Sequence, residues 1–416
     1  MRPFSPEAAP EAHSPLARNA PLEHRVADSV FMNTNLSRRI KNLAPSATLA
    51  VGRKAKELQD QGVKVLNLSV GEPDFPAPTE AKEAVVAAVK DNFSRYTDSR
   101  GILVLREAIC RRVREETGLV YGVNQVIVSC GSKHTLYNLF QSLLDPGDEV
   151  LVPVPYWTSY PEMVRLADGV PVFVPAGTDL KVKPGDLERF FTDKTRCLII
   201  NSPNNPSGAV YTEKELEDIA RWVQDKEVLV ISDDAYQRFL YDGQPFCSIA
   251  TFSGMEERTV IVGAASKTYA MTGWRIGWFL GSQELADACA KLQDQSTSNP
   301  CSLSQKAALA ALSGNQQTVQ EMCQAFQKRR DLLLKTLSPA RGISYPHPAG
   351  AFYLFFTHPS IKDSVAFASR LLEEARVALV PGKAFGMEGY LRLSYAVSEE
   401  VLAEAANRLV AYLQKG

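Results

Sequence analysis

The sequence predicts an α/β fold in which helices cover both faces of a largely parallel sheet. Short apolar runs typical of buried strands alternate with helical patterns such as residues 216–223; the runs lie at residues 125–129, 149–153, 196–201, 228–232 and 259–263. The chain has 416 residues, of which 45% are hydrophobic and 22% charged, which is enough for two domains. Such sheets bind ligands at the carboxyl ends of their strands, so we expect the loops after these runs to carry the site.

The composition argues against several classes of partner. The formal net charge is −1 and no basic tract is present, so we expect no nucleic-acid partner. No apolar run is long enough to span a bilayer, so we expect no membrane partner. The seven cysteines form no CxxC pair, which favours reduced thiols and a cytoplasmic location. With only five scattered histidines, we expect no metal site.

Residues 1–32 differ from the rest of the chain. They show no hydrophobic periodicity, lack the apolar centre of a secretory signal, and carry Pro3, Pro6, Pro10, Pro15 and Pro21. We therefore expect a disordered, proline-rich extension.

The most informative motif is SKTYAMTGWRIGW, at residues 266–278. Lys267 comes directly after a predicted buried strand, and Arg275 lies eight positions later. A lysine that holds an aldehyde cofactor covalently needs a rigid, partly desolvated pocket, and the planar fork of an arginine suits a phosphate. Most lysines are solvated surface residues, but the preceding buried strand argues against that reading here. Gly273 and Gly277 indicate backbone that passes close to another group.

Polar residues also follow the other predicted strands. Gly131 and Ser132 lead into a helix that runs towards residue 144, and such a helix start can bind a phosphate or be an ordinary cap. Asp233 directly follows a strand, where it can be a functional carboxylate or a helix cap. Trp157 and Asn205, the latter in the turn SPNNPSG, are weak signals alone, because tryptophans are often core residues and Asn-Pro turns are common.

In order and approximate spacing, these motifs resemble those of the class I aminotransferases, which are fold-type I pyridoxal 5′-phosphate (PLP) enzymes. The resemblance begins near residue 33 and extends to the C-terminus. It implies a large PLP-binding domain at residues 79–310 and a smaller α/β domain formed by residues 33–78 and 311–416. It also implies a homodimer, because Tyr96 in RYTDSRG matches a tyrosine that reaches the cofactor phosphate of the other subunit.

The resemblance assigns roles residue by residue. PLP would be bonded to Lys267, with Asp233 on its ring nitrogen and Tyr236 on its phenolate oxygen. A carboxylate at that nitrogen keeps it protonated and makes the ring a better electron sink. The other implied cofactor contacts are Tyr96, Gly131, Ser132, Lys133, Trp157, Asn205, Ser266 and Arg275. Arg392 in RLSYA would bind the substrate α-carboxylate, which the backbone of Gly71 in GEPDF would approach, beside Trp157 and Asn205.

Two segments and one residue also resemble those of the bacterial aspartate aminotransferase subgroup. They are PSAT at residues 45–48, QSTSNP at residues 295–300, and Lys133. This resemblance implies that Lys133 and Thr48 bind the side chain of a dicarboxylate, although Lys133 can equally be a solvated charge at a helix end. The expected reaction is ping-pong amino transfer between L-aspartate and 2-oxoglutarate.

Two alternatives stay open. One is an aminotransferase for aromatic amino acids or prephenate, although Ala44 stands where prephenate-using members carry a basic residue. The other is a PLP-dependent lyase on the same fold, which needs the same lysine, aspartate and arginine. A PLP-binding transcriptional regulator is disfavoured, because residues 1–32 are too few and too irregular for a helix-turn-helix module.

Overall fold

The computed structural model describes residues 35–45 and 47–414. The predicted disordered extension at residues 1–32 lies outside this part of the chain. The chain divides into two units, Met1–Lys41 and Asn42–Gly416; the short helix α1 (Arg38–Lys41) belongs to the first, and all that follows concerns the second. No helix among the described residues is long and apolar enough to cross a membrane.

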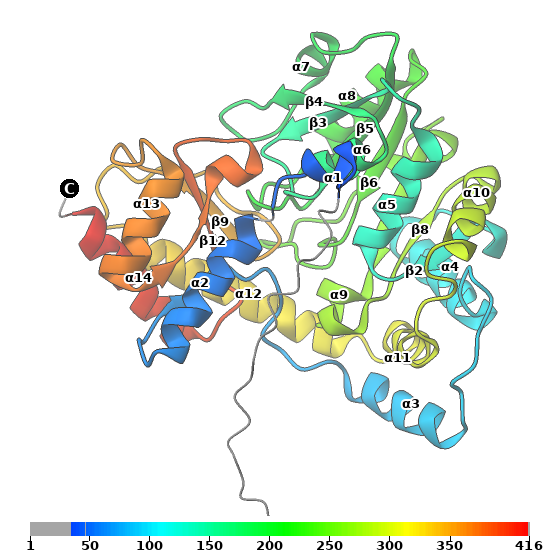
Figure 1. The fold of residues 1–416 in the computed structure, drawn as a ribbon, viewed down its shortest axis with the longest axis horizontal. Coiled ribbons are helices and arrows are strands. Elements are labelled where there is room, and N and C mark those ends of the chain that lie inside the picture. The colour runs from blue at the N-terminus through cyan, green and yellow to red at the C-terminus, as the bar shows by residue number, and fades with distance from the viewer. Residues whose placement is uncertain (1–34, 46, 415–416) are drawn as a thin grey trace, which may run out of the picture. The chain divides into compact units, whose positions relative to one another are not determined.

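A seven-stranded sheet is the largest element of the second unit (Figure 1). Its order is β2-β8-β7-β6-β5-β3-β4, and neighbouring strands are parallel except at β8, which is antiparallel to both β7 and β2. The strands are β2 (Val126–Ser129), β3 (Glu149–Val154), β4 (Val170–Pro175), β5 (Thr195–Asn201), β6 (Leu229–Asp233), β7 (Thr259–Ala264) and β8 (Gly277–Leu280). The predicted largely parallel sheet is confirmed, with β4 and β8 added to the five expected strands.

Helices cover both faces of this sheet. Leu198 and Val230 enter a core with α7 (Pro184–Glu188) and α8 (Glu213–Gln224), whereas the next residues, Ile199 and Ile231, enter a core on the opposite face. That second core is completed by α5 (Ser132–Leu143), α6 (Tyr160–Leu166) and α10 (Gln283–Asp294). A third core, at the β2 end, includes α3 (Thr79–Lys90), α4 (Leu103–Thr117) and α11 (Ser302–Ser313). Burial on both faces explains why the strands read as continuous apolar runs.

A smaller antiparallel sheet has the order β11-β12-β9, with β9 (Tyr353–Thr357), β11 (Val380–Pro381) and β12 (Tyr390–Ser394). Nearby, β1 (Leu66–Asn67) pairs in parallel with β10 (Val377–Ala378). The helices of this region are α2 (Ala47–Asp60), α12 (Gln317–Leu337), α13 (Ser364–Arg370) and α14 (Glu399–Leu413). Figure 1 shows α12 extending between the two sheets.

One apolar core joins residues on both sides of the predicted domain boundary at residue 310. Phe239 follows the large sheet in sequence, yet its ring packs against Phe326 of α12 and Phe352 beside β9. The proposed domain boundaries stay a prediction.

The prediction of close backbone approach is correct for one of the two glycines. A Cβ on Gly277 would lie 2.2 Å from the backbone nitrogen of Ser132, so no side chain fits there. A Cβ on Gly273 would meet no atom of the described residues within 4 Å, so within this part of the chain that prediction was wrong. The difference arises because Gly277 belongs to β8, which passes the start of α5, whereas Gly273 lies in an exposed turn.

Candidate active site

A cavity of about 320 Å³ opens at the carboxyl ends of the parallel strands. Its walls contain many of the residues singled out in the sequence: Gly71, Ser132, Lys133, Trp157, Asn205, Asp233, Tyr236, Lys267 and Arg392. The remaining lining residues are Leu49, Thr158, Ser159, Tyr160, Asn201, Ala235 and Tyr353. The loops after the strands therefore converge on one cavity, as expected from the sequence.

Lys267 lies on the short helix α9 (Ala265–Thr268), directly after β7. Its Nζ donates a hydrogen bond of 2.7 Å to the backbone carbonyl of Gly71. Burial lowers the pKa of Lys267 to about 8, and the positive charges of Arg275 and Arg392 act in the same direction, while Glu72 opposes them. At pH 7 about one tenth of an amine with this pKa is neutral, far more than for an ordinary lysine, and the neutral form is the one that nucleophilic and proton-transfer roles require.

Asp233 ends β6, and its side chain reaches the cavity although only 4% of it is exposed. Tyr160 donates a hydrogen bond of 2.6 Å to its Oδ2, and the backbone nitrogen of Ala235 donates one of 3.2 Å to its Oδ1. Burial raises the pKa of Asp233, while both hydrogen bonds and the positive charge of Lys267 oppose that rise. The site therefore contains a desolvated carboxylate held in one orientation by two donors.

Arg392, on β12, links the two sheets at the cavity. Its Nη1 donates to Oδ1 of Asn205 at 3.0 Å, and its Nη2 donates to the carbonyl of Ser69 at 2.7 Å. Asn205 in turn donates from Nδ2 to the hydroxyl of Tyr236 at 3.5 Å. Only 2% of Arg392 is exposed, and its Nε has no hydrogen-bond partner among the described residues. A guanidinium in this state can bind a small carboxylate.

The start of α5 forms a candidate anion site. Gly131 is its cap, with φ of 86°, and a Cβ there would lie 2.6 Å from Nη2 of Arg275. Only glycine therefore lets the arginine approach this helix end so closely. The unpaired N–H groups of the first turn, the positive end of the helix dipole and the guanidinium favour an oxyanion such as phosphate.

Lys133 lies between this cavity and a second one of about 500 Å³. Its Nζ is 5.1 Å from the centroid of the Trp157 ring. Burial, followed by the like charge of Arg275, lowers the pKa of Lys133, and no carboxylate of the described residues contributes to the shift. A partly desolvated cation that meets no carboxylate in the described part of the chain is a suitable partner for an anionic ligand group.

Comparison with known proteins identifies the family. Residues 63–409 match the aminotransferase class I and II family. The chain belongs to the class I and II aminotransferases. A relative from Rickettsia felis, a probable aspartate/prephenate aminotransferase, is 46% identical over 90% of this chain and 95% of its own.

Solved aspartate aminotransferases are similar in structure as well. The enzyme from Rhizobium meliloti has a TM-score of 0.88 and 37% identity, and covers 92% of this chain and 99% of its own. The enzyme from Thermus thermophilus, solved with maleate, has a TM-score of 0.87 and 44% identity. The match covers 91% of this chain and 99% of the Thermus thermophilus chain. The predicted family and enzyme class are confirmed.

Some predicted site residues of this aminotransferase are not in the cavity wall. Gly131 and Arg275 adjoin it at the start of α5, and Ser266 is buried beside Lys267. Tyr96 is 91% exposed and reaches no group of the cavity within its own chain. The side chain of Thr48 lies outside the described residues, so its predicted role stays untested.

The aminotransferase site also contains two tyrosines that the sequence did not single out. Tyr160, the first residue of α6, packs edge-on against the ring of Trp157, with the ring centroids 5.3 Å apart. Tyr353 is on β9, with its hydroxyl 2.9 Å from that of Tyr236. Trp157 lies in the loop before α6, so no helical spacing related Tyr160 to it in the sequence. For Tyr353 no local pattern was available.

Proposed function

We propose that this aminotransferase binds PLP through Lys267 and transfers an amino group between L-aspartate and 2-oxoglutarate. The observation that carries the proposal is the desolvated amine of Lys267, which shares one cavity with the carboxylate of Asp233 and the guanidinium of Arg392. These are the three charged groups that the chemistry of an amino acid on an aldehyde cofactor requires.

The groups present fit PLP. The start of α5 and Arg275 suit its phosphate, Asp233 suits a protonated ring nitrogen, and Lys267 suits its aldehyde. The cavity of about 320 Å³ is in the range of small-molecule sites. When bound, the cofactor supplies an electron-accepting ring that stabilises negative charge at the substrate α-carbon.

Three residues of the chain carry out proton transfer, substrate orientation and stabilisation of the protonated ring nitrogen. The neutral amine of Lys267 removes the proton from the α-carbon of the amino acid. In the second half of the reaction, the same residue delivers a proton to the α-carbon of the oxo acid. Arg392 binds the α-carboxylate through its planar fork and so orients the α-carbon towards that amine. Asp233, kept anionic by Tyr160, holds the proton on the ring nitrogen.

Lys133 supports the dicarboxylate specificity. It is a cation in the same cavity as Arg392, and no carboxylate of residues 35–45 or 49–414 contributes to its pKa shift. Two cations in one cavity suit a substrate with two carboxylates. The Thermus thermophilus relative was solved with maleate, which is such a dicarboxylate. The name of the Rickettsia felis relative keeps prephenate as the second candidate substrate, and the cavity of about 500 Å³ beyond Lys133 offers room for a bulkier group.

The proposal includes a homodimer in which Tyr96 serves the site of the other subunit. Tyr96 is a large aromatic residue with 91% of its surface exposed, which is unusual unless a partner covers it. A cytoplasmic location is part of the same proposal.

The test is an absorbance spectrum of the purified protein before and after adding L-aspartate, and again after 2-oxoglutarate. We expect the visible band to disappear with aspartate and return with the oxo acid, and Lys267→Ala to show neither change. A band that responds to aromatic amino acids or prephenate, but not to aspartate, would discard the dicarboxylate specificity. Release of pyruvate and ammonia from a β-substituted amino acid without an oxo acid would favour a lyase.

A further inference from the structure

Tyr353 contacts two of the groups on which the proposed function depends, although it is 117 positions from one of them in sequence. Its side chain is fully buried in the protein and still lines the cavity. Its hydroxyl lies 2.9 Å from the hydroxyl of Tyr236, and its ring centroid lies 4.5 Å from Cζ of Arg392.

The ring of Tyr353 supports the guanidinium of Arg392. The ring of Phe385 lies 5.0 Å from Cζ of the same arginine. Asn205 and Ser69 accept hydrogen bonds from the two terminal nitrogens of Arg392. Two aromatic contacts and two acceptors fix the plane of a group that would otherwise rotate. A cation–π contact of this kind is strongest where water is excluded, as it is here.

The hydroxyl of Tyr353 is placed to orient the proton of Tyr236, and either hydroxyl can donate in their contact. A phenol has one proton to donate and an oxygen that accepts. If Tyr353 donates to Tyr236, the oxygen of Tyr236 is satisfied, and its own proton is free to point into the cavity. A donor to that oxygen also strengthens the hydrogen bond that Tyr236 makes in turn, because chained hydrogen bonds polarise one another.

The surroundings leave space for this arrangement and hold it in place. A Cβ on Gly71 would lie 2.6 Å from the hydroxyl of Tyr353, so the glycine accommodates the tyrosine. The carbonyl of the same glycine accepts the hydrogen bond from Lys267. The backbone carbonyl of Gly71 therefore positions Lys267, and the absence of a side chain on Gly71 leaves room for the hydroxyl of Tyr353.

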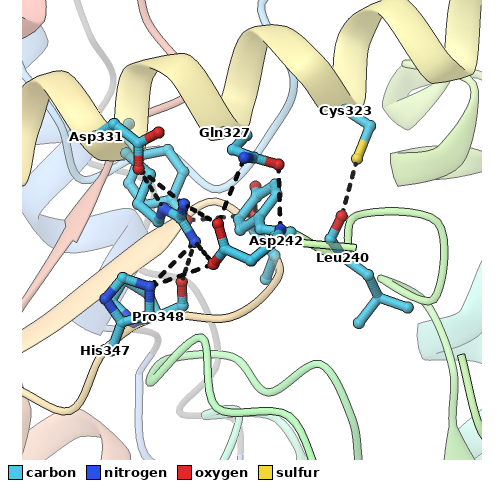
Figure 2. A network of polar contacts seen from close by, with 11 residues as sticks. Leu240, Asp242, Cys323, Gln327, Asp331, His347 and Pro348 are labelled. Atoms are coloured by element: carbon cyan, nitrogen blue, oxygen red, sulfur yellow. Dashed lines mark hydrogen bonds and ion pairs between the residues drawn. The ribbon is translucent and has the colours of Figure 1, made fainter. Parts of the chain in front are cut away.

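Hydrogen bonds outside the cavity connect the segments that contain Tyr236 and Tyr353. Arg330 donates to both carboxylate oxygens of Asp242, at 2.6 and 2.8 Å, and to the carbonyl of Pro348 at 3.2 Å (Figure 2). The backbone nitrogen of Tyr241 donates to Ala349 at 3.0 Å. These bonds hold the loop after Tyr236 against the approach to β9.

From this geometry we infer that Tyr353 is a positioning residue with two separable roles: its hydroxyl orients Tyr236, and its ring orients Arg392. The inference rests on the proposed function for what those two residues bind. It predicts that removing the hydroxyl affects the cofactor side of the site, whereas removing the ring also affects the carboxylate side.

The experiment compares Tyr353→Phe and Tyr353→Met with wild type in two measurements. The first is the pH midpoint of the visible absorbance of the bound cofactor. The second is the dissociation constant of maleate, a dicarboxylate that has no amino group to react. Tyr395→Phe is the matched control, because Tyr395 is equally buried and does not line the cavity, and its hydroxyl contacts the carbonyl of Ala351, at 3.4 Å, and the side chain of Tyr241.

For Tyr353→Phe we expect the absorbance midpoint to rise by about half a pH unit or more, because Tyr236 becomes a weaker donor to the ionised form. Maleate binding should stay within about twofold, since the ring is kept. For Tyr353→Met we expect the same rise and a loss of maleate affinity of about tenfold. Tyr395→Phe should change neither value.

An unchanged midpoint in Tyr353→Phe would overturn the role of the hydroxyl, and a loss of maleate affinity in that variant would overturn the separation of roles. Both results are interpretable only on a wild type that binds the cofactor and maleate; a wild type that binds neither overturns the proposed function instead. Thermal unfolding of each variant identifies a folding defect. If Tyr353→Met does not fold, Tyr353→Phe still decides the inference, because it keeps the ring and the volume.

Discussion

Tyr160 donates a hydrogen bond of 2.6 Å to Oδ2 of Asp233, in a region from which water is almost excluded. Burial alone would favour the neutral carboxylic acid, which cannot hold a proton on a basic ring nitrogen. The phenol compensates, because its hydrogen bond is stronger to the carboxylate than to the acid. Tyr160 thus favours the charged form of Asp233 against the effect of burial.

Tyr160→Phe should lower kcat/KM by about 10- to 100-fold, because the carboxylate loses a charge-assisted hydrogen bond. The measurement is transamination across a pH series, in which the limb that reports ionisation of Asp233 should move to higher pH. Tyr211→Phe is the control, since Tyr211 is also buried but accepts its hydrogen bond from Val182 in a different core. Equal effects of the two substitutions on activity would contradict the role of Tyr160.

The pKa of Lys267, lowered to about 8, predicts how the protein without cofactor takes it up. Only the neutral amine reacts with an aldehyde, so the rate of uptake should rise about tenfold per pH unit below pH 8 and level off above it. Stopped-flow absorbance over a pH series measures this rate. A midpoint near 10.5, the ordinary value for a lysine, would show that the amine is not desolvated as described.

Lys133→Ala should discriminate between substrates. We expect kcat/KM for L-aspartate to fall by about 10- to 100-fold, while that for L-alanine changes little, because only aspartate has a second carboxylate to bind. The control is Lys383→Ala, since Lys383 lines the adjoining cavity of about 500 Å³ and not the site itself. Equal losses for both amino acids would assign Lys133 to the cofactor rather than to the side chain.

Asp242→Asn tests the network of Figure 2. The hydrogen bonds from Arg330, which is 2% exposed, lower the pKa of Asp242 to about 2, below its ordinary value of 3.8. A carboxyl whose pKa is lower in the folded state stabilises that state above pH 4 or so, and loses this contribution as the pH falls towards about 2. The melting temperature of Asp242→Asn should therefore be below that of wild type at pH 7, and the difference should shrink between about pH 4 and pH 2.

An exposed carboxylate provides the comparison for Asp242. Asp218→Asn removes contacts to Lys214 and Arg221, which are surface ion pairs on one helix. Such pairs contribute little, so this variant should melt close to wild type at all pH values. A pH-independent difference for Asp242→Asn would show that the substitution acts through packing and not through charge.

Much of the site was predictable because the sheet is largely parallel. Asp233 and Lys267 each lie within a few residues of the end of a buried apolar run, and parallel strands bring all such ends to one edge. The apolar runs themselves were unambiguous because both faces of the sheet are covered. Strand β8 was not expected, although all four of its residues are buried.

Local sequence determined the fold class, the strand ends and the charged groups placed on them, because these depend on periodicity and on residues close together in the chain. Only the tertiary structure decided which side chains meet across the two sheets: Tyr353 with Tyr236, and Arg392 with Asn205. The partners in these pairs are 117 and 187 positions apart, so no local pattern relates them. Their contact depends on how one sheet packs against the other, which is a property of the whole core.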